Sequence, residues 1–80
     1  MHTDPLIPLD MLATGEWGEV VEIHGDTEWV ARMGELGLQS GNRLQIVQSG
    51  CPCLIRVANS RLCVRGEHAM QIFVRPVSCV

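Results

Sequence analysis

The chain has 80 residues, of which 46% are hydrophobic, and a formal net charge of −3. A chain of this length forms one small domain. Its stability is marginal, because folding hides only about 60% of the surface that the open chain exposes. An acidic chain lacks the positive charge that non-specific binding to nucleic acid or anionic lipid requires, and no apolar run approaches the ~18 residues that span a bilayer. We therefore expect no nucleic-acid partner and no membrane insertion.

The first part of the chain predicts an extended lead-in followed by a strand. The prolines within residues 1–8 restrict φ and disfavour helix, so this segment should be extended. Asp10 can cap a single helical turn that Gly15 closes. Alternating apolar and acidic residues then predict a half-buried strand over residues 17–24.

A short helix is predicted next, over residues 28–36, where apolar side chains recur at helical spacing. Asp26 or Thr27 is a suitable N-cap. Gly37 should end the helix, because glycine adopts positive φ readily. Gly34 costs ~1 kcal/mol relative to alanine inside a helix, so tertiary packing must hold this segment.

The remaining residues predict three further strand regions. They are a strand over residues 43–48, a hairpin of strands 53–58 and 61–65, and a last strand over 70–74. A turn or single helical turn over 66–69 should separate the hairpin from the last strand. Asn59-Ser60 should turn the hairpin, and Pro76 should stop the last strand. Five short strands and one inserted helix predict a mainly β fold, a small curved barrel formed as a single domain by residues 1–80, with loose termini over 1–5 and 76–80.

The hairpin register decides which side chains share a face. A two-residue turn at Asn59-Ser60 pairs Arg56 with Cys63, Val57 with Leu62, and Ile55 with Val64. Cys53 then joins the core face, and Cys63 falls on the opposite face. A single site that uses both thiols would therefore need a different register.

Four segments, in order and at matching spacings, resemble the FeoA family of bacterial ferrous-iron uptake. They are Pro-Leu-Asp-Met-Leu-Ala-Thr-Gly-Glu (8–16), Gly-Glu-Val-Val-Glu-Ile-His-Gly (18–25), Ala-Arg-Met-Gly-Glu-Leu-Gly-Leu-Gln-Ser-Gly (31–41) and Cys-Val-Arg-Gly-Glu-His-Ala-Met-Gln-Ile-Phe-Val (63–74). The third is similar to the family motif Arg-Leu-x-x-Leu-Gly-Leu-x-x-Gly, with Met33 at its first leucine. The fourth is similar to the closing pattern Arg-x-x-x-Ala-x-x-Ile-x-Val.

The resemblance implies an SH3-like β-barrel with an inserted helix, a fold that is also appended to iron-dependent repressors. It implies a small cytoplasmic accessory protein, not an enzyme, that binds and modulates the cytosolic GTPase region of the membrane transporter FeoB. The residues agree, since the sequence has no glycine-rich phosphate loop with a lysine and no evident nucleophile–base pair. A detached regulatory domain of the repressor type remains an alternative.

Two groups of side chains are candidates for partner contact: Trp29, Arg32 and Met33 on the helix, and Arg56, Arg61 and Arg65 on one outward face of the hairpin. Tryptophan is enriched at binding hot spots, although Trp29 suits a core position equally well. Guanidinium groups bind carboxylates or phosphates, although solvated surface arginines fit the pattern as well. Aromatic side chains for stacking on bases are scarce, and two copies could also pair through an exposed strand edge as a homodimer.

Cys51-Pro52-Cys53 is a candidate metal site for Fe²⁺ or Zn²⁺. Two thiolates at i and i+2 of an extended segment point the same way, and Cys63, Cys79 or His68 could add a ligand. C-x-C is not the usual zinc spacing, however, and a free buried cysteine commonly packs as a small apolar residue. A metal-binding or metal-sensing module is therefore the alternative function; neither the Cys-Pro-Cys segment nor Gly34 is typical of the family.

Overall fold

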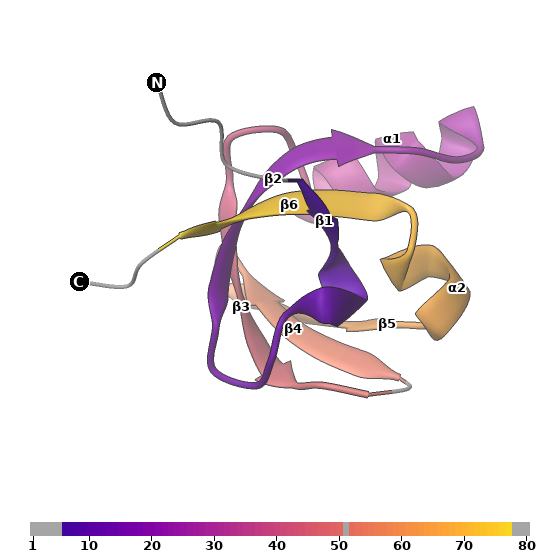
Figure 1. The fold of residues 1–80 in the computed structure, drawn as a ribbon. Helices are drawn as coiled ribbons and strands as arrows, with labels where there is room; N and C mark the ends of the chain where they lie inside the picture. The colour runs from indigo at the N-terminus through magenta and orange to yellow at the C-terminus, as the bar shows by residue number, and fades with distance from the viewer. Residues whose placement is uncertain (1–5, 51, 78–80) are drawn as a thin grey trace, which may run out of the picture.

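A computed structural model describes residues 6–50 and 52–77. These residues form one antiparallel sheet that curls into a barrel, with three short helical segments (Figure 1). The strands are β1 (Ile7–Pro8), β2 (Trp17–Ile23), β3 (Arg43–Gln48), β4 (Cys53–Val57), β5 (Ser60–Val64) and β6 (Ile72–Val77). Their order in the sheet is β1-β6-β2-β3-β4-β5. The helical segments are a 3-10 turn η1 (Leu9–Met11), the helix α1 (Thr27–Glu35) and the single turn α2 (Gly66–Ala69).

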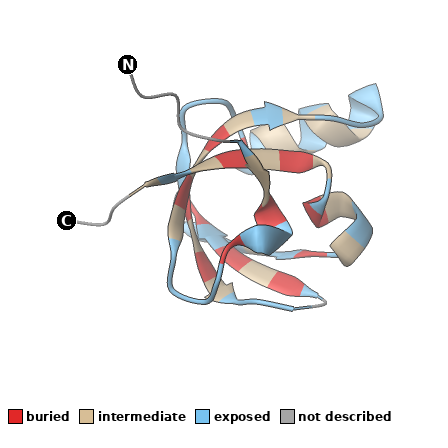
Figure 2. Ribbon diagram, viewed as in Figure 1, coloured by how far each residue is buried: buried red, intermediate tan, exposed pale blue. Residues whose placement is uncertain are grey.

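The inward face of this sheet forms the core. Its buried hydrophobic residues are Leu9, Leu12, Val20, Leu38, Leu44, Ile46, Cys53, Ile55, Val57, Val64, Ala69, Ile72 and Val74. In β3, β4 and β6 these residues stand at every second position, as the side-chain period of a strand requires (Figure 2). None of the described polar or charged side chains is buried. The predicted mainly β barrel with an inserted helix is confirmed.

The lead-in forms a strand of its own, so the sheet has one strand more than the five predicted. Ile7 and Pro8 pair with Val74 and Phe73 of β6. Within residues 6–50 and 52–77 no ladder joins β1 to β5, so the sheet stays open on that side. There η1 contacts α2, and Leu9 and Ala69 from these two turns are fully buried. These two side chains cover the core where the sheet is open.

The segment Leu36-Gly37-Leu38 ends α1 and directs the chain back toward the core. Gly37 has a φ of +109°, and its N–H donates to the carbonyl of Gly34 at 3.1 Å. The Leu38 N–H donates to the Met33 carbonyl at 2.9 Å, which completes a Schellman motif. The motif turns the chain so that Leu38 enters the core, where it is 1% exposed. The predicted helix end at Gly37 is confirmed.

The predicted hairpin turn is wrong by one residue. Val57 pairs with Ser60, so the turn is Ala58-Asn59, with Ala58 at a φ of +55°. The observed pairs are Arg56 with Arg61, Ile55 with Leu62, Leu54 with Cys63, and Cys53 with Val64. This register differs from the predicted one by two positions, which leaves every side chain on its predicted face. A shift of two positions keeps the same side chains buried, so burial of the core face does not depend on which two residues form the turn.

The last strand also differs from its prediction. β6 begins at Ile72 and continues through Pro76, which pairs with Gly18 of β2, and on to Val77. Beyond Val74, β6 has no partner strand on its other side among the described residues. A proline is tolerated at such an edge position, because no neighbouring carbonyl needs its N–H. Pro76 and Val77 are therefore paired rather than loose, and the termini over 1–5 and 78–80 lie outside the described residues.

The glycine inside α1 and the glycine just after its end should respond in opposite directions to alanine. A Cβ at Gly34 would lie 3.6 Å from the nearest side-chain atom of Gln39, an ordinary contact, so Gly34→Ala should raise the free energy of unfolding by about 1 kcal/mol. Gly37→Ala should lower it by about 1–2 kcal/mol, because alanine is strained at positive φ. Urea unfolding followed by circular dichroism measures both changes. A stable Gly37→Ala variant would contradict the role of the Schellman motif.

Candidate functional site

The helix α1 lies on the outside of the barrel (Figure 1). None of its residues is fully buried, and the half-buried Trp29 and Met33 attach it to the core. Arg32 is exposed, as are Glu28 and Glu35. The helix therefore presents a largely polar surface, and two apolar side chains anchor it.

Trp29 contacts a side chain that is distant from it in sequence. Its ring lies 4.7 Å, centroid to centroid, from the imidazole of His68 on α2, at an interplanar angle of 34°. Gly25 leaves room for the ring, since a Cβ there would lie 3.1 Å from a Trp29 ring carbon. This stack ties α1 to α2. No motif or spacing in the sequence connects Trp29 with His68, so only the fold reveals their contact.

The strand arginines meet on the outward face of the hairpin. Arg56 and Arg61 are direct cross-strand partners, and both are exposed. Arg65, also exposed, continues the extended backbone of β5 with φ −71° and ψ 153°. No carboxylate forms an ion pair with any of these three within residues 6–50 and 52–77. Their predicted positions on one face are confirmed, whereas their role in binding a partner stays a prediction.

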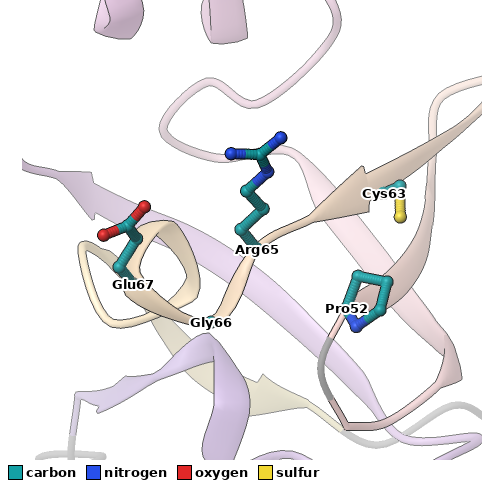
Figure 3. Close-up of a pocket in the computed structure, with 5 residues that line it drawn as sticks. All are labelled: Pro52, Cys63, Arg65, Gly66 and Glu67. Atoms are coloured by element: carbon teal, nitrogen blue, oxygen red, sulfur yellow. The ribbon is translucent and has the colours of Figure 1, made fainter.

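A groove of about 680 Å³ lies at the C-terminal end of β5. Its lining residues are Pro52, Cys63, Arg65, Gly66 and Glu67 (Figure 3). Pro52 and the Cys63 thiol stand on one side and Glu67 on the other, so one end of the hairpin and α2 form its walls. The groove adjoins the arginine face, because Arg65 belongs to both.

The two described cysteines occupy different environments. Cys53 is 1% exposed in the core, and burial raises the pKa of its thiol, with further increases from the negative charges of Asp10 and Cys63. Cys63 is exposed, on the opposite face, across from Leu54. The side chains that the structure describes contain no cluster of three or more His, Cys, Asp or Glu that could hold a metal ion. Cys51, the second thiol of the predicted Cys-Pro-Cys metal site, lies outside the described residues, so this site stays a prediction.

The curled antiparallel sheet with one inserted helix is a small SH3-like barrel. A family model described as the FeoA domain matches residues 7–76. The chain therefore belongs to the FeoA family, whose members are small accessory proteins of ferrous iron transport. The predicted resemblance is confirmed.

Solved structures agree with this assignment. An iron uptake regulatory protein (FeoA) is 27% identical with a TM-score of 0.83, covering 91% of this chain and 100% of its own. The FeoA of Stenotrophomonas maltophilia, solved with zinc and described as an SH3 domain protein, is 25% identical with a TM-score of 0.69, covering 82% and 86%. A manganese-dependent transcriptional repressor shares the fold alone, at 17% identity and a TM-score of 0.83, over 96% of this chain and 45% of the repressor.

A search of curated proteins found no match to this chain. Among the helices in residues 6–50 and 52–77, none has the length and apolar character needed to cross a membrane.

The two thiols should differ in their rate of alkylation. At pH 8 iodoacetamide should modify Cys63 readily and Cys53 at least tenfold more slowly, because Cys53 is buried and its raised pKa keeps it protonated. Peptide mass mapping after timed quenching measures each rate. Equal rates in the native protein, with both thiols reacting freely in urea as the control, would contradict the buried position of Cys53.

Proposed function

We propose that this protein is a cytoplasmic, non-enzymatic accessory protein that binds the cytosolic GTPase region of the ferrous iron transporter FeoB and modulates its activity. The observation that carries the proposal is the FeoA domain match over residues 7–76. A small domain that is linked to iron transport can act by binding a transporter, because such binding requires only an exposed surface. The Stenotrophomonas relative is itself described as a candidate activating factor of bacterial ferrous iron transport.

Two surfaces can make the contact. One is the exposed side of α1 with Arg32, beside the anchoring residues Trp29 and Met33. The other is the arginine face with Arg56 and Arg61, whose guanidinium groups have no described acidic partner. Both suit a partner with carboxylates, because guanidinium groups form charge-assisted hydrogen bonds with them.

Charge reversal distinguishes these two surfaces. The double substitution Arg56→Glu with Arg61→Glu should weaken binding to the purified GTPase region at least tenfold, or about 1.4 kcal/mol, if the arginine face makes the contact. Arg43→Glu reverses an exposed arginine on β3 and serves as the control, which should bind with unchanged affinity. Isothermal titration at two salt concentrations, with GTP hydrolysis as a second readout, measures the effect.

A loss of affinity in Arg32→Glu alone would assign the contact to α1. No association of the unsubstituted protein with the GTPase region at high micromolar concentration would overturn the proposal.

We propose metal binding at Cys51 and Cys53 as a second candidate function, because a FeoA relative was solved with zinc. The sequence spacing supports two thiolate ligands, whereas the burial of Cys53 requires the start of β4 to open before its thiolate can reach a metal. Equilibrium dialysis against Zn²⁺ or Fe²⁺ should then give one bound ion per chain, lost in Cys51→Ser. The variant Cys63→Ser is the control and should keep the ion. No bound metal at stoichiometric load would exclude this function.

A further inference from the structure

We propose that the free edge of β5 receives an extended acidic segment of the partner as an added antiparallel strand, so that the sheet continues across the interface. The inference rests on the proposed binding to a protein partner and specifies the chemistry of the segment that the partner offers. Such strand addition derives affinity from main-chain hydrogen bonds and specificity from side chains on the two faces of the new strand.

The sheet has one edge long enough for this purpose. β5 pairs with β4 along its whole length, from Ser60 to Val64, and is the last strand in the sheet order. No described strand pairs with its other side, so alternate backbone N–H and C=O groups of β5 have no ladder partner there. β1, at the opposite end of the order, spans only Ile7–Pro8, and proline cannot donate to a ladder.

The charges of the hairpin itself are of one sign. Residues 53–65 contain no acidic residue but three arginines, at positions 56, 61 and 65, whereas residues 16–35 contain six acidic residues and a single arginine. The chain is acidic as a whole, so the hairpin is a basic region on an acidic protein. Glu67 on α2 marks the end of this region.

An added strand could place an acidic side chain next to Arg61. Arg56 and Arg61 lie directly opposite one another, an arrangement of like charges that destabilises a sheet. An acidic side chain on the added strand, directly opposite Arg61, would lie on the same face with its Cβ about 5 Å away. It would relieve the repulsion and gain a charge-assisted hydrogen bond.

A second copy of the chain does not fit this edge as well. Antiparallel pairing of β5 with β5 of another copy would set Arg61 opposite Arg61 or Arg65 in the registers centred on Arg61 or Cys63, which like-charge repulsion opposes. A nucleic acid would find phosphate contacts but no stacking partners, because Trp17, Trp29 and Phe73 lie on β2, α1 and β6. The observations therefore favour an acidic polypeptide.

The probe is a capped synthetic peptide of alternating glutamate and valine, titrated into ¹⁵N-labelled protein. We expect the amide resonances of residues 60–64 to shift, and their hydrogen exchange to slow about tenfold at a peptide concentration ten times Kd. A peptide of the same sequence with N-methyl groups at alternate residues keeps the charge but cannot form the ladder. It should not slow the exchange.

Two matched variants report the contribution of charge. Arg61→Gln should weaken peptide binding several-fold, and Arg43→Gln, which removes the same charge from β3, should leave it unchanged. Equal binding of the N-methylated peptide, or of a lysine–valine peptide, would overturn strand addition. The same holds if a single-stranded oligonucleotide slows the exchange of these amides as strongly, or if the protein dimerises through β5 without peptide.

The transporter's GTPase region separates this inference from the proposed function. If the region binds but leaves the exchange of residues 60–64 unchanged, strand addition is wrong and the proposed function stands. If the region does not bind while the acidic peptide protects β5, the proposed function is wrong and the edge serves another acidic partner.

Discussion

Burial of one face of a single curled sheet is the constraint on which this structure depends. The described residues form one core. Along β3, β4 and β6 the buried residues stand at every second position, and each of these buried residues is hydrophobic. A one-residue slip of any strand would move that face into water, whereas a two-residue slip would not. The hairpin shows the consequence, because the turn lies at Ala58-Asn59 while Cys53 still faces the core and Cys63 still faces solvent.

Helical segments complete what the strands leave open. At the seam, η1 and α2 bring Leu9 and Ala69 into the core, and the Schellman motif at Gly37 delivers Leu38. The helix α1 itself contributes no fully buried residue and is held through Met33 and through the stack of Trp29 on His68. The two surfaces proposed for partner contact are therefore built differently: α1 rests on a few anchoring side chains, and the arginine face is part of the sheet.

Acidic and basic residues are concentrated on different elements of the fold. Acidic residues lie mainly on β2 and α1, and exposed arginines lie on β3, β4 and β5 and directly after β5. Arg75 of β6 forms an ion pair with Glu19 of β2. Arg56 and Arg61 instead face one another, which leaves a basic surface beside an open strand edge. The arginine face and the free edge of β5 are therefore neighbours, so one partner segment could contact both.

The sequence by itself determined the mainly β barrel, the helix that ends at Gly37, the faces of the hairpin and the FeoA family, because each follows from local periodicity, glycine conformation or an ordered set of motifs. Only the tertiary structure decided that Ile7 and Pro8 form a sixth strand, that β6 continues through Pro76, and that Trp29 stacks on His68. These features depend on which distant segments become neighbours. A pattern of residues along one segment carries no information about the partner that the fold brings beside it.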